Sequence, residues 1–252
     1  MQKKIGRIIC FLLAALLTGS VMLNFFLFNY SRLYYFQLNS LRLDPLNLEF
    51  FPTDAQQTET LKPEATKVVF FGDSRAASWP SPSLNEFEFI NRGIGSQTSN
   101  QVLQRYNAHV QPLSPEILVV QVCINDLKTI PLFPDKKTAI TANCKRNIQQ
   151  IVHLARDQGI TVIVTTVFPV GKFPIQRKIF WSEDIPLAID DVNQFIKSLG
   201  DDNVIVFDTF AILADESGRL RDTYRIDELH LNSAGYEAIN REFTRLLKTI
   251  KK

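Results

Sequence analysis

The sequence predicts a three-layer α/β/α sandwich with a parallel sheet of five strands. Two observations lead to this fold class. Short apolar runs alternate with segments of helical periodicity, which is typical of consecutive strand and helix units. Several runs are apolar at every position, as expected where helices cover both faces of a parallel sheet. The runs predicted as strands are residues 68–71, 86–90, 117–122, 161–168 and 204–207.

Segments with apolar residues three or four positions apart lie between and after these runs and predict helices. A short one ends at His109 and contains Val102, Leu103 and Tyr106. The next ends by Gly159 and carries, on one face, Ile140, Cys144, Ile148, Ile151 and Leu154. Another ends at Gly200 and carries Ile189, Val192, Ile196 and Leu199. The last begins after Asn232, a typical N-cap residue, and carries Tyr236, Ile239, Phe243, Leu247 and Ile250.

Residues 1–30 are predicted to form a short cytoplasmic stub and a transmembrane anchor. Residues 8–28 carry no charge, and about 20 apolar residues suffice to cross a bilayer as a helix. Basic residues are concentrated before this stretch, at Lys3, Lys4 and Arg7. The positive-inside rule therefore places the N-terminus in the cytoplasm and the rest of the chain outside it, in the periplasm if the cell is Gram-negative.

A cleaved signal peptide is the alternative for the same segment. Thr18 and Ser20 are small residues of the kind that flank a cleavage site. The apolar run continues past them to Phe28, which favours an uncleaved anchor.

The rest of the chain is predicted to contain a connector, residues 31–66, and one folded domain, residues 67–252. The connector becomes polar and patternless at residues 52–62, as a tether does. With 252 residues, of which 45% are hydrophobic and 21% charged, the chain has material for one sizeable core. Its net charge is only +2 and its basic residues are scattered, which argues against nucleic acid as a partner.

The three cysteines, Cys10, Cys123 and Cys144, do not have the spacing of metal ligands. A chain of this length with a disulfide framework would carry more of them. A single disulfide between Cys123 and Cys144 stays open at this point.

Polar residues suited to catalysis follow three of the predicted strands. Ser74 follows the first strand, residues 93–96 follow the second and Asn125 follows the third. Ligands of parallel α/β sheets bind beyond the carboxyl ends of the strands, so we expect these loops to meet at one edge. Near the C-terminus, Asp227 and His230 lie three residues apart. A serine hydroxyl needs a base to take its proton and an acid to orient that base, and these two residues supply both.

Four segments resemble the signature blocks of the SGNH/GDSL hydrolases, in the same order. They are Phe71-Gly72-Asp73-Ser74, Asn91-Arg92-Gly93-Ile94-Gly95-Ser96, Cys123-Ile124-Asn125-Asp126 and Asp227-Glu228-Leu229-His230. The resemblance spans residues 67–250 and implies a flavodoxin-like fold and ester hydrolysis without a metal or cofactor. By the same resemblance, Ser74 matches the nucleophile, His230 the base and Asp227 the acid that orients the base.

The resemblance also implies an oxyanion hole, formed by the Ser74 N–H, the side-chain amide of Asn125 and a backbone N–H of Gly95 or Ser96. Which of the last two donates stays open. Cys123 and Ser96 depart from the family pattern, which usually has Gly at both positions. The change at Cys123 costs little if that position only packs beneath its loop, and the Ser96 N–H remains a usable donor unless the backbone there demands glycine.

Two other interpretations compete with this one. Residues 72–76 come close to the G-x-S-x-G elbow of α/β-hydrolases, but that nucleophile follows several strands whereas Ser74 follows the first. Alternatively, each residue is an ordinary loop or cap residue, and only their joint occurrence argues for catalysis. The other histidines, His109 and His153, lie in predicted helices, where we expect structural or exposed positions.

The predicted function is that of a membrane-anchored, extracytoplasmic ester hydrolase acting on a small-molecule, lipid or O-acylated glycan ester. The segment after the fourth strand is expected to wall its substrate pocket with Phe173, Pro174, Ile175, Ile179, Phe180 and Trp181. The alternative for this segment is a loop packed on the domain. The alternatives for the whole chain are an acyltransferase to an envelope glycan with the same triad, and a non-catalytic anchored module.

Overall fold

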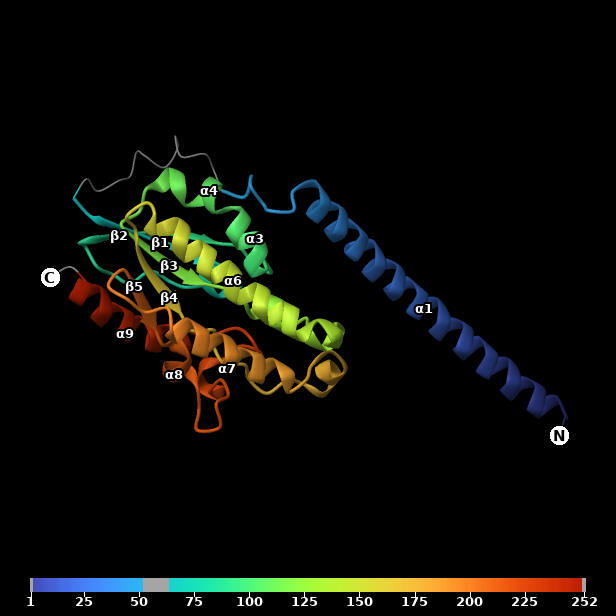
Figure 1. The fold of residues 1–252 in the computed structure, drawn as a ribbon. Helices are drawn as coiled ribbons and strands as arrows, with labels where there is room; N and C mark the ends of the chain where they lie inside the picture. The colour runs from blue at the N-terminus through green and yellow to red at the C-terminus, as the bar shows by residue number, and fades with distance from the viewer. Residues whose placement is uncertain (1, 52–63, 251–252) are drawn as a thin grey trace. The chain divides into compact units, whose positions relative to one another are not determined.

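The computed structural model describes residues 2–51 and 64–250, and the chain divides into two compact units, Met1–Asn47 and Leu48–Lys252 (Figure 1). The expected tether at residues 52–62 lies outside the described residues.

The first unit is a single long helix, α1 (Gln2–Leu43). By length and composition, its residues from Lys3 to Leu43 could cross a membrane, and a signal sequence near the N-terminus meets the same criteria. The helix continues beyond the apolar run at residues 8–28 because residues 29–43 contain neither Gly nor Pro. It ends just before Asp44 and Pro45, where the proline disfavours a helical conformation for the residue before it. The boundary expected at residues 30 and 31 is therefore not a break in the helix.

The second unit contains a five-stranded sheet in which every neighbouring pair is parallel, as the sequence predicts. The strands are β1 (Thr66–Gly72), β2 (Phe87–Gly93), β3 (Ile117–Gln121), β4 (Thr161–Thr165) and β5 (Val204–Phe207). Their spatial order is β2-β1-β3-β4-β5, the flavodoxin-like order. The order reverses between β1 and β3, and a crevice beyond the carboxyl ends of these two strands is the expected ligand site.

Strand β4 ends three residues before the predicted limit at residue 168. Beyond Thr165 the backbone of Val167 bonds to a side chain instead of to a strand: its N–H donates to Asn193 Oδ1 at 2.7 Å, and its carbonyl accepts from Asn193 Nδ2 at 3.1 Å. A buried asparagine thus replaces the ladder, and the apolar run continues without strand geometry.

Helices cover both faces of the sheet, so the layers are α/β/α (Figure 1). One face carries α3 (Ser99–Gln104), α4 (Tyr106–His109), α6 (Lys137–Arg156) and α7 (Asp184–Lys197). The other carries α8 (Thr209–Leu213) and α9 (Ser233–Ile250). Alternate residues of a strand serve the two faces: Val69 and Phe71 belong to the first core, Val68 and Phe70 to the second.

The helix predicted to end at His109 is divided into α3 and α4 at Arg105, whose side chain is fully buried. The last helix begins as predicted, because Asn232 Oδ1 accepts the Gly235 N–H at 3.0 Å. Two four-residue helices, α2 (Ser74–Ala77) and α5 (Ile124–Leu127), follow β1 and β3. The 3-10 helices are η3 (Gln111–Leu113), η4 (Ile130–Leu132), η5 (Pro134–Lys136), η6 (Ile175–Phe180) and η7 (Asp222–Tyr224).

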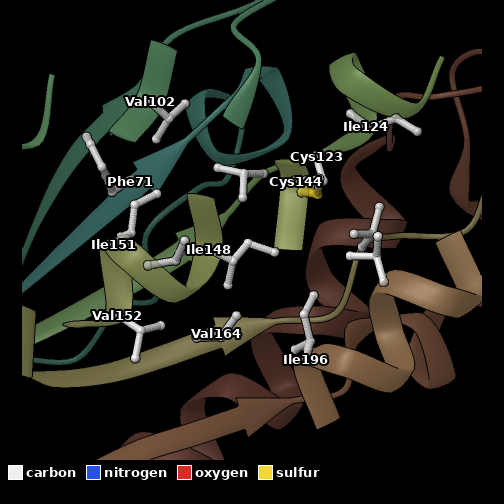
Figure 2. Close-up of a cluster of buried hydrophobic side chains, with 14 of the residues drawn as sticks. Phe71, Val102, Cys123, Ile124, Cys144, Ile148, Ile151, Val152, Val164 and Ile196 are labelled. Carbon is white, nitrogen blue, oxygen red and sulfur yellow. A yellow bond between two sulfur atoms is a disulfide. The ribbon is translucent and has the colours of Figure 1, made fainter. Parts of the chain in front are cut away.

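A disulfide joins Cys123, just before α5, to Cys144 on α6, so the pairing left open by the sequence is formed. Figure 2 shows the bond among buried side chains of the first core, near Ile148 and Ile124. The two Cα atoms are 5.9 Å apart, and both cysteines are fully buried.

Candidate active site

The loop after β1 presents Ser74 at the carboxyl edge of the sheet. Gly72 ends the strand, and a Cβ atom there would lie 1.8 Å from the carbonyl oxygen of Gln121, so only glycine fits. Asp73 caps the next helix, since its side chain accepts the Arg75 N–H at 2.9 Å. Ser74 is the first residue of α2 and is half-buried. The structure thus explains both residues before the serine: Gly72 is required by the close carbonyl and Asp73 caps the helix.

Asp227 and His230 form a compact loop held by three hydrogen bonds. Asp227 Oδ1 accepts the backbone N–H groups of Leu229 and His230, at 2.8 and 2.7 Å. Asp227 Oδ2 accepts from His230 Nδ1 at 2.8 Å. One carboxylate thus fixes both the backbone of this loop and the orientation of the imidazole.

The imidazole reaches the serine across 156 positions of sequence. His230 Nε2 lies 3.2 Å from Ser74 Oγ, within hydrogen-bonding distance. Because Nδ1 donates to a carboxylate, Nε2 is the nitrogen left to accept a proton from the hydroxyl. The structure brings together the three residues that the sequence suggested for the triad, in the order that nucleophile activation requires.

The electrostatics of Asp227 suit this arrangement. Burial by itself raises the pKa of its carboxyl, but the hydrogen bonds from the His230 ring and from two backbone N–H groups outweigh burial and hold the pKa below its usual range. Asp227 is therefore ionised near neutral pH and can accept the hydrogen bond from His230 Nδ1. Asp73, which precedes Ser74, differs from Asp227 because burial raises the pKa of its carboxyl to about 6.

The residues suggested for the oxyanion hole lie on three loops. Asn125 is buried in α5, and its Nδ2 donates one hydrogen to the Gln97 carbonyl at 2.9 Å. The second amide hydrogen has no partner among the described residues and remains free for a ligand. Gly95 lies beside the serine, since a Cβ atom on it would be 3.9 Å from Ser74 Cβ.

Both departures from the family pattern lie in the left-handed backbone region, which favours glycine. Ser96 has φ of 65° and Cys123 has φ of 93°. The condition for a small cost at Cys123 is not met, because the residue does more than pack beneath its loop: it has this conformation and forms the disulfide. For Ser96, the backbone does favour glycine, and the chain tolerates a serine there on an exposed loop.

Sequence reasoning missed two buried arginines that tie the loops of the site together. Arg75 donates to the carbonyls of Leu229, at 3.0 Å, and Phe168, at 3.1 Å, so it connects the serine helix to the histidine loop. Burial lowers the pKa of Arg75 to about 10, and the side chain remains charged at neutral pH. Its position directly after Ser74 was the only available signal.

The second arginine, Arg105, connects the loops of the oxyanion side. It donates to the Gly72 carbonyl at 2.9 Å and to Gln97 Oε1 at 2.6 Å. Gln97 in turn holds Asn125 through its backbone carbonyl. Asp126 adds a further link, because it accepts both the N–H and the hydroxyl of Ser99. No spacing rule in the sequence reveals these long-range contacts.

The other two histidines are structural or exposed, as expected. His109 is buried, donates from Nε2 to the Leu48 carbonyl at 3.1 Å and packs edge-on against Phe51. These contacts attach residues 48–51 to the rest of the second unit. His153 is exposed and lies 3.6 Å from Asp157 on the same helix.

A flavodoxin-like sheet with a serine, an asparagine and an Asp-x-x-His segment at its carboxyl edge defines a class of acylhydrolases. The chain belongs to the GDSL-like lipase/acylhydrolase family, whose sequence profile matches residues 64–238. The resemblance seen in the four sequence segments is thereby confirmed.

Solved structures agree with this assignment. A putative acylhydrolase from Bacteroides fragilis is 27% identical, with a TM-score of 0.67, over 83% of this chain and 99% of that one. A GDSL-like lipase from Bacteroides thetaiotaomicron is 24% identical, with a TM-score of 0.65, over 81% and 98% of the two chains. An acetylxylan esterase from Geobacillus stearothermophilus shares the fold at 16% identity, with a TM-score of 0.56, over 73% and 95%. A search of curated proteins found no relative.

Proposed function

We propose that this protein is a membrane-anchored, extracytoplasmic serine ester hydrolase. The observation that carries the proposal is the hydrogen-bonded series from Ser74 Oγ to His230 Nε2 and from His230 Nδ1 to Asp227 Oδ2. It lies at the edge of the sheet where ligands of this fold bind. Membership of an acylhydrolase family supports the ester as the bond that is cleaved.

In the proposed reaction, Ser74 Oγ attacks the ester carbonyl while His230 takes the hydroxyl proton. Asp227 stabilises the imidazolium that forms. The Ser74 N–H, the free amide hydrogen of Asn125 and a backbone N–H of Gly95 or Ser96 bind the developing oxyanion. His230 then protonates the leaving alcohol, and a water molecule repeats the sequence to release the acid from the acyl-enzyme.

The substrate we propose has an apolar acyl group carried by a lipid or a glycan. Exposed apolar side chains lie on segments that follow β3 and β4 or directly precede Asp227; they are Leu132, Phe133, Ile175, Phe180 and Ile226. Arg177 of η6 pairs with buried Glu228, which places the segment after β4 next to the Asp227 loop. Trp181 packs partly against the core and contacts Phe173 with the two rings tilted, so Phe180 is the more accessible aromatic residue of this segment.

Phe180→Ala tests the substrate part of this proposal. We expect kcat/KM for long-chain aryl esters to fall by about 10-fold, as a lost apolar contact of 1 to 2 kcal/mol implies, while acetate esters change little. Leu187→Ala, an exposed apolar residue on α7, is the matched control. An unchanged chain-length profile would remove Phe180 from the substrate site.

Anchoring outside the cytoplasm has two supports. Helix α1 carries an apolar stretch of bilayer length with basic residues before it. A buried disulfide is typical of proteins that fold in an oxidising compartment. Carbonate extraction of membranes, together with the mass of the mature chain, separates an anchor from a cleaved signal peptide: a chain shortened by the apolar segment and found in the soluble fraction would exclude the anchor.

Labelling by a fluorophosphonate probe tests the activated serine before any substrate is known. We expect the full chain in detergent to be labelled and to hydrolyse short aryl esters. Ser74→Ala should abolish labelling and lower turnover by a factor on the order of 10⁴ to 10⁶. Ser81→Ala, on an exposed loop, is the control. A Ser74→Ala protein with normal turnover would exclude Ser74, and an unlabelled, inactive wild-type chain would favour a non-catalytic module.

Acceptor dependence separates hydrolysis from acyl transfer. Release of free acid without any added glycan supports the hydrolase. If acid release is slow and acyl-glycan forms only when an acceptor is present, the same triad serves a transferase instead.

A further inference from the structure

The Cys123–Cys144 disulfide lies directly behind the oxyanion side of the site. Cys123 is the residue before α5, and Asn125 is the second residue of that helix. The carbonyl of Cys123 accepts the N–H groups of Asp126 and Leu127, both at 3.0 Å, and so begins the helix. The conformation of Cys123 therefore sets the direction in which this short helix, with Asn125 on it, leaves the sheet.

That conformation is costly for any residue with a side chain. At φ of 93°, Cys123 lies in the region where a Cβ atom approaches the neighbouring carbonyl oxygen, and glycine alone avoids the conflict. A helix of four residues has too few internal hydrogen bonds to impose such a conformation by itself. Some other contact has to hold the backbone there.

The other end of the disulfide provides a rigid support. Cys144 lies on α6, a helix of 20 residues, one turn before Ile148, and both side chains are fully buried in the first core (Figure 2). The disulfide fixes the Cβ atom of Cys123 to this helix. On the other side, Asn125 donates to the carbonyl of Gln97, and Arg105 holds the side chain of Gln97.

We propose that the Cys123–Cys144 disulfide is a positioning element for catalysis, which keeps the backbone at Cys123 in its left-handed conformation and thereby directs the Asn125 amide at the oxyanion. The proposal rests on the hydrolase function and on the oxyanion role of Asn125. It assigns to the two cysteines a part in the chemical step that goes beyond stabilising the fold.

Two double variants separate positioning from stabilisation. Cys123→Ala with Cys144→Ala removes the bond and leaves a Cβ atom at φ of 93°. Cys123→Gly with Cys144→Ala removes the same bond but places at this position the residue that adopts the conformation freely. Both lose the cross-link, so both should lose thermal stability, and the alanine variant should lose somewhat more because its Cβ atom remains in the left-handed conformation. Thiol titration of the denatured full chain checks the starting material, since only Cys10 should react in the wild type.

Steady-state kinetics should distinguish the two variants. We expect the alanine variant to lose about 10- to 100-fold in kcat with little change in KM, because a displaced oxyanion donor affects the transition state more than substrate binding. The glycine variant should recover most of that kcat although it also lacks the bond. Equal kcat values for the two variants would overturn the proposal, whether both are low or both are normal.

The second readout comes from Cys123→Ala with Cys144→Ala, introduced into a protein that also carries Asn125→Ala. If the disulfide acts through Asn125, its removal should lower kcat no further once the amide is gone. A further loss of the same size as in the wild-type background would mean that the disulfide acts elsewhere, and would overturn the proposal. An inactive wild-type chain would instead reject the proposed function, and this inference with it.

Discussion

The two halves of the candidate active site are built in different ways. The base and its orienting acid lie within four consecutive residues, and a single carboxylate makes the hydrogen bonds that shape their loop. The oxyanion side is assembled from the loops after β1, β2 and β3, and is held by a disulfide, a buried arginine and a carboxylate–serine pair. One half is local in sequence and the other depends on long-range packing.

The two halves are therefore vulnerable to different changes. The geometry of a local loop survives changes elsewhere in the domain, but it fails if its own central residue is changed. An assembled half tolerates the loss of one contact, because several others remain, and its failures are graded. Substitutions in the two halves test this contrast.

Asp227→Asn should damage the local half most severely. An amide in place of the carboxylate cannot accept from the ring and both backbone N–H groups in the same way, and it favours the wrong tautomer of His230. We expect kcat to fall by about 10³- to 10⁴-fold, as in other triads that lose their acid. Asp157→Asn, an exposed aspartate at the end of α6, should change kcat by less than about twofold, as surface changes away from the catalytic residues usually do. A modest loss in Asp227→Asn would contradict the central role of this carboxylate.

Asn125→Ala should damage the assembled half less. Loss of one oxyanion donor costs about 3 kcal/mol, or roughly 10²-fold in kcat, and the backbone donors remain. The exposed Asn143→Ala on α6 is the control. If Asn125→Ala were as inactive as Asp227→Asn, the proposed difference between the two halves would be wrong.

The pH dependence of the free energy of unfolding tests Asp73, the buried residue that precedes Ser74 and lies between the two halves. The pKa of buried Asp73 is raised to about 6 from an ordinary value of 3.8, so the folded state favours its protonated form. This stabilisation is complete below pH 3.8 and is lost as the pH rises through about 6. Asp73→Asn keeps the cap acceptor and should flatten this part of the curve, by about 3 kcal/mol at most.

Urea unfolding of both proteins at pH 4.5 and pH 7 measures this difference. The wild-type free energy of unfolding should fall more than that of Asp73→Asn between the two values. Equal decreases in the free energy of unfolding of the two proteins would show that Asp73 has the same pKa in the folded and unfolded states.

Ser96→Gly should have the smallest effect. Relief of a left-handed serine, less the entropy that glycine adds to the unfolded chain, should raise the free energy of unfolding by about 0.5 to 1 kcal/mol. Ser114, with φ of 45° on an exposed turn away from the site, is the matched control, and Ser114→Gly should gain as much. A gain at position 114 alone would mean that Ser96 makes a compensating contact.

The sequence predicted those parts of the molecule that depend on local pattern. Continuous apolar runs predicted five parallel strands because burial on both faces leaves that pattern, and Asn232 predicted a helix start because its side chain caps the first turn. The Asp-x-x-His spacing predicted a compact pair because three residues suffice for one carboxylate to reach the ring. Convergence of the loops followed from the general rule for parallel sheets.

The remaining features depend on contacts that spacing does not encode. The left-handed backbone of Cys123 and its bond to Cys144 depend on the packing of α6 against α5. Arg75 and Arg105 look like surface residues in the sequence, yet both are fully buried because carbonyl groups from distant loops satisfy them. The end of β4 was misplaced because a side chain, Asn193, replaces a strand partner.

Arg75 has a consequence for protein engineering. Its guanidinium joins the carbonyl of Leu229, next to the base, to the turn that bears the nucleophile. Grafting the four-residue Asp-x-x-His loop onto a new scaffold would therefore transfer the base and its acid without the clamp that sets their distance from the serine. A working transplant would have to carry the arginine, and a cavity to hold it, along with the residues that perform the chemistry.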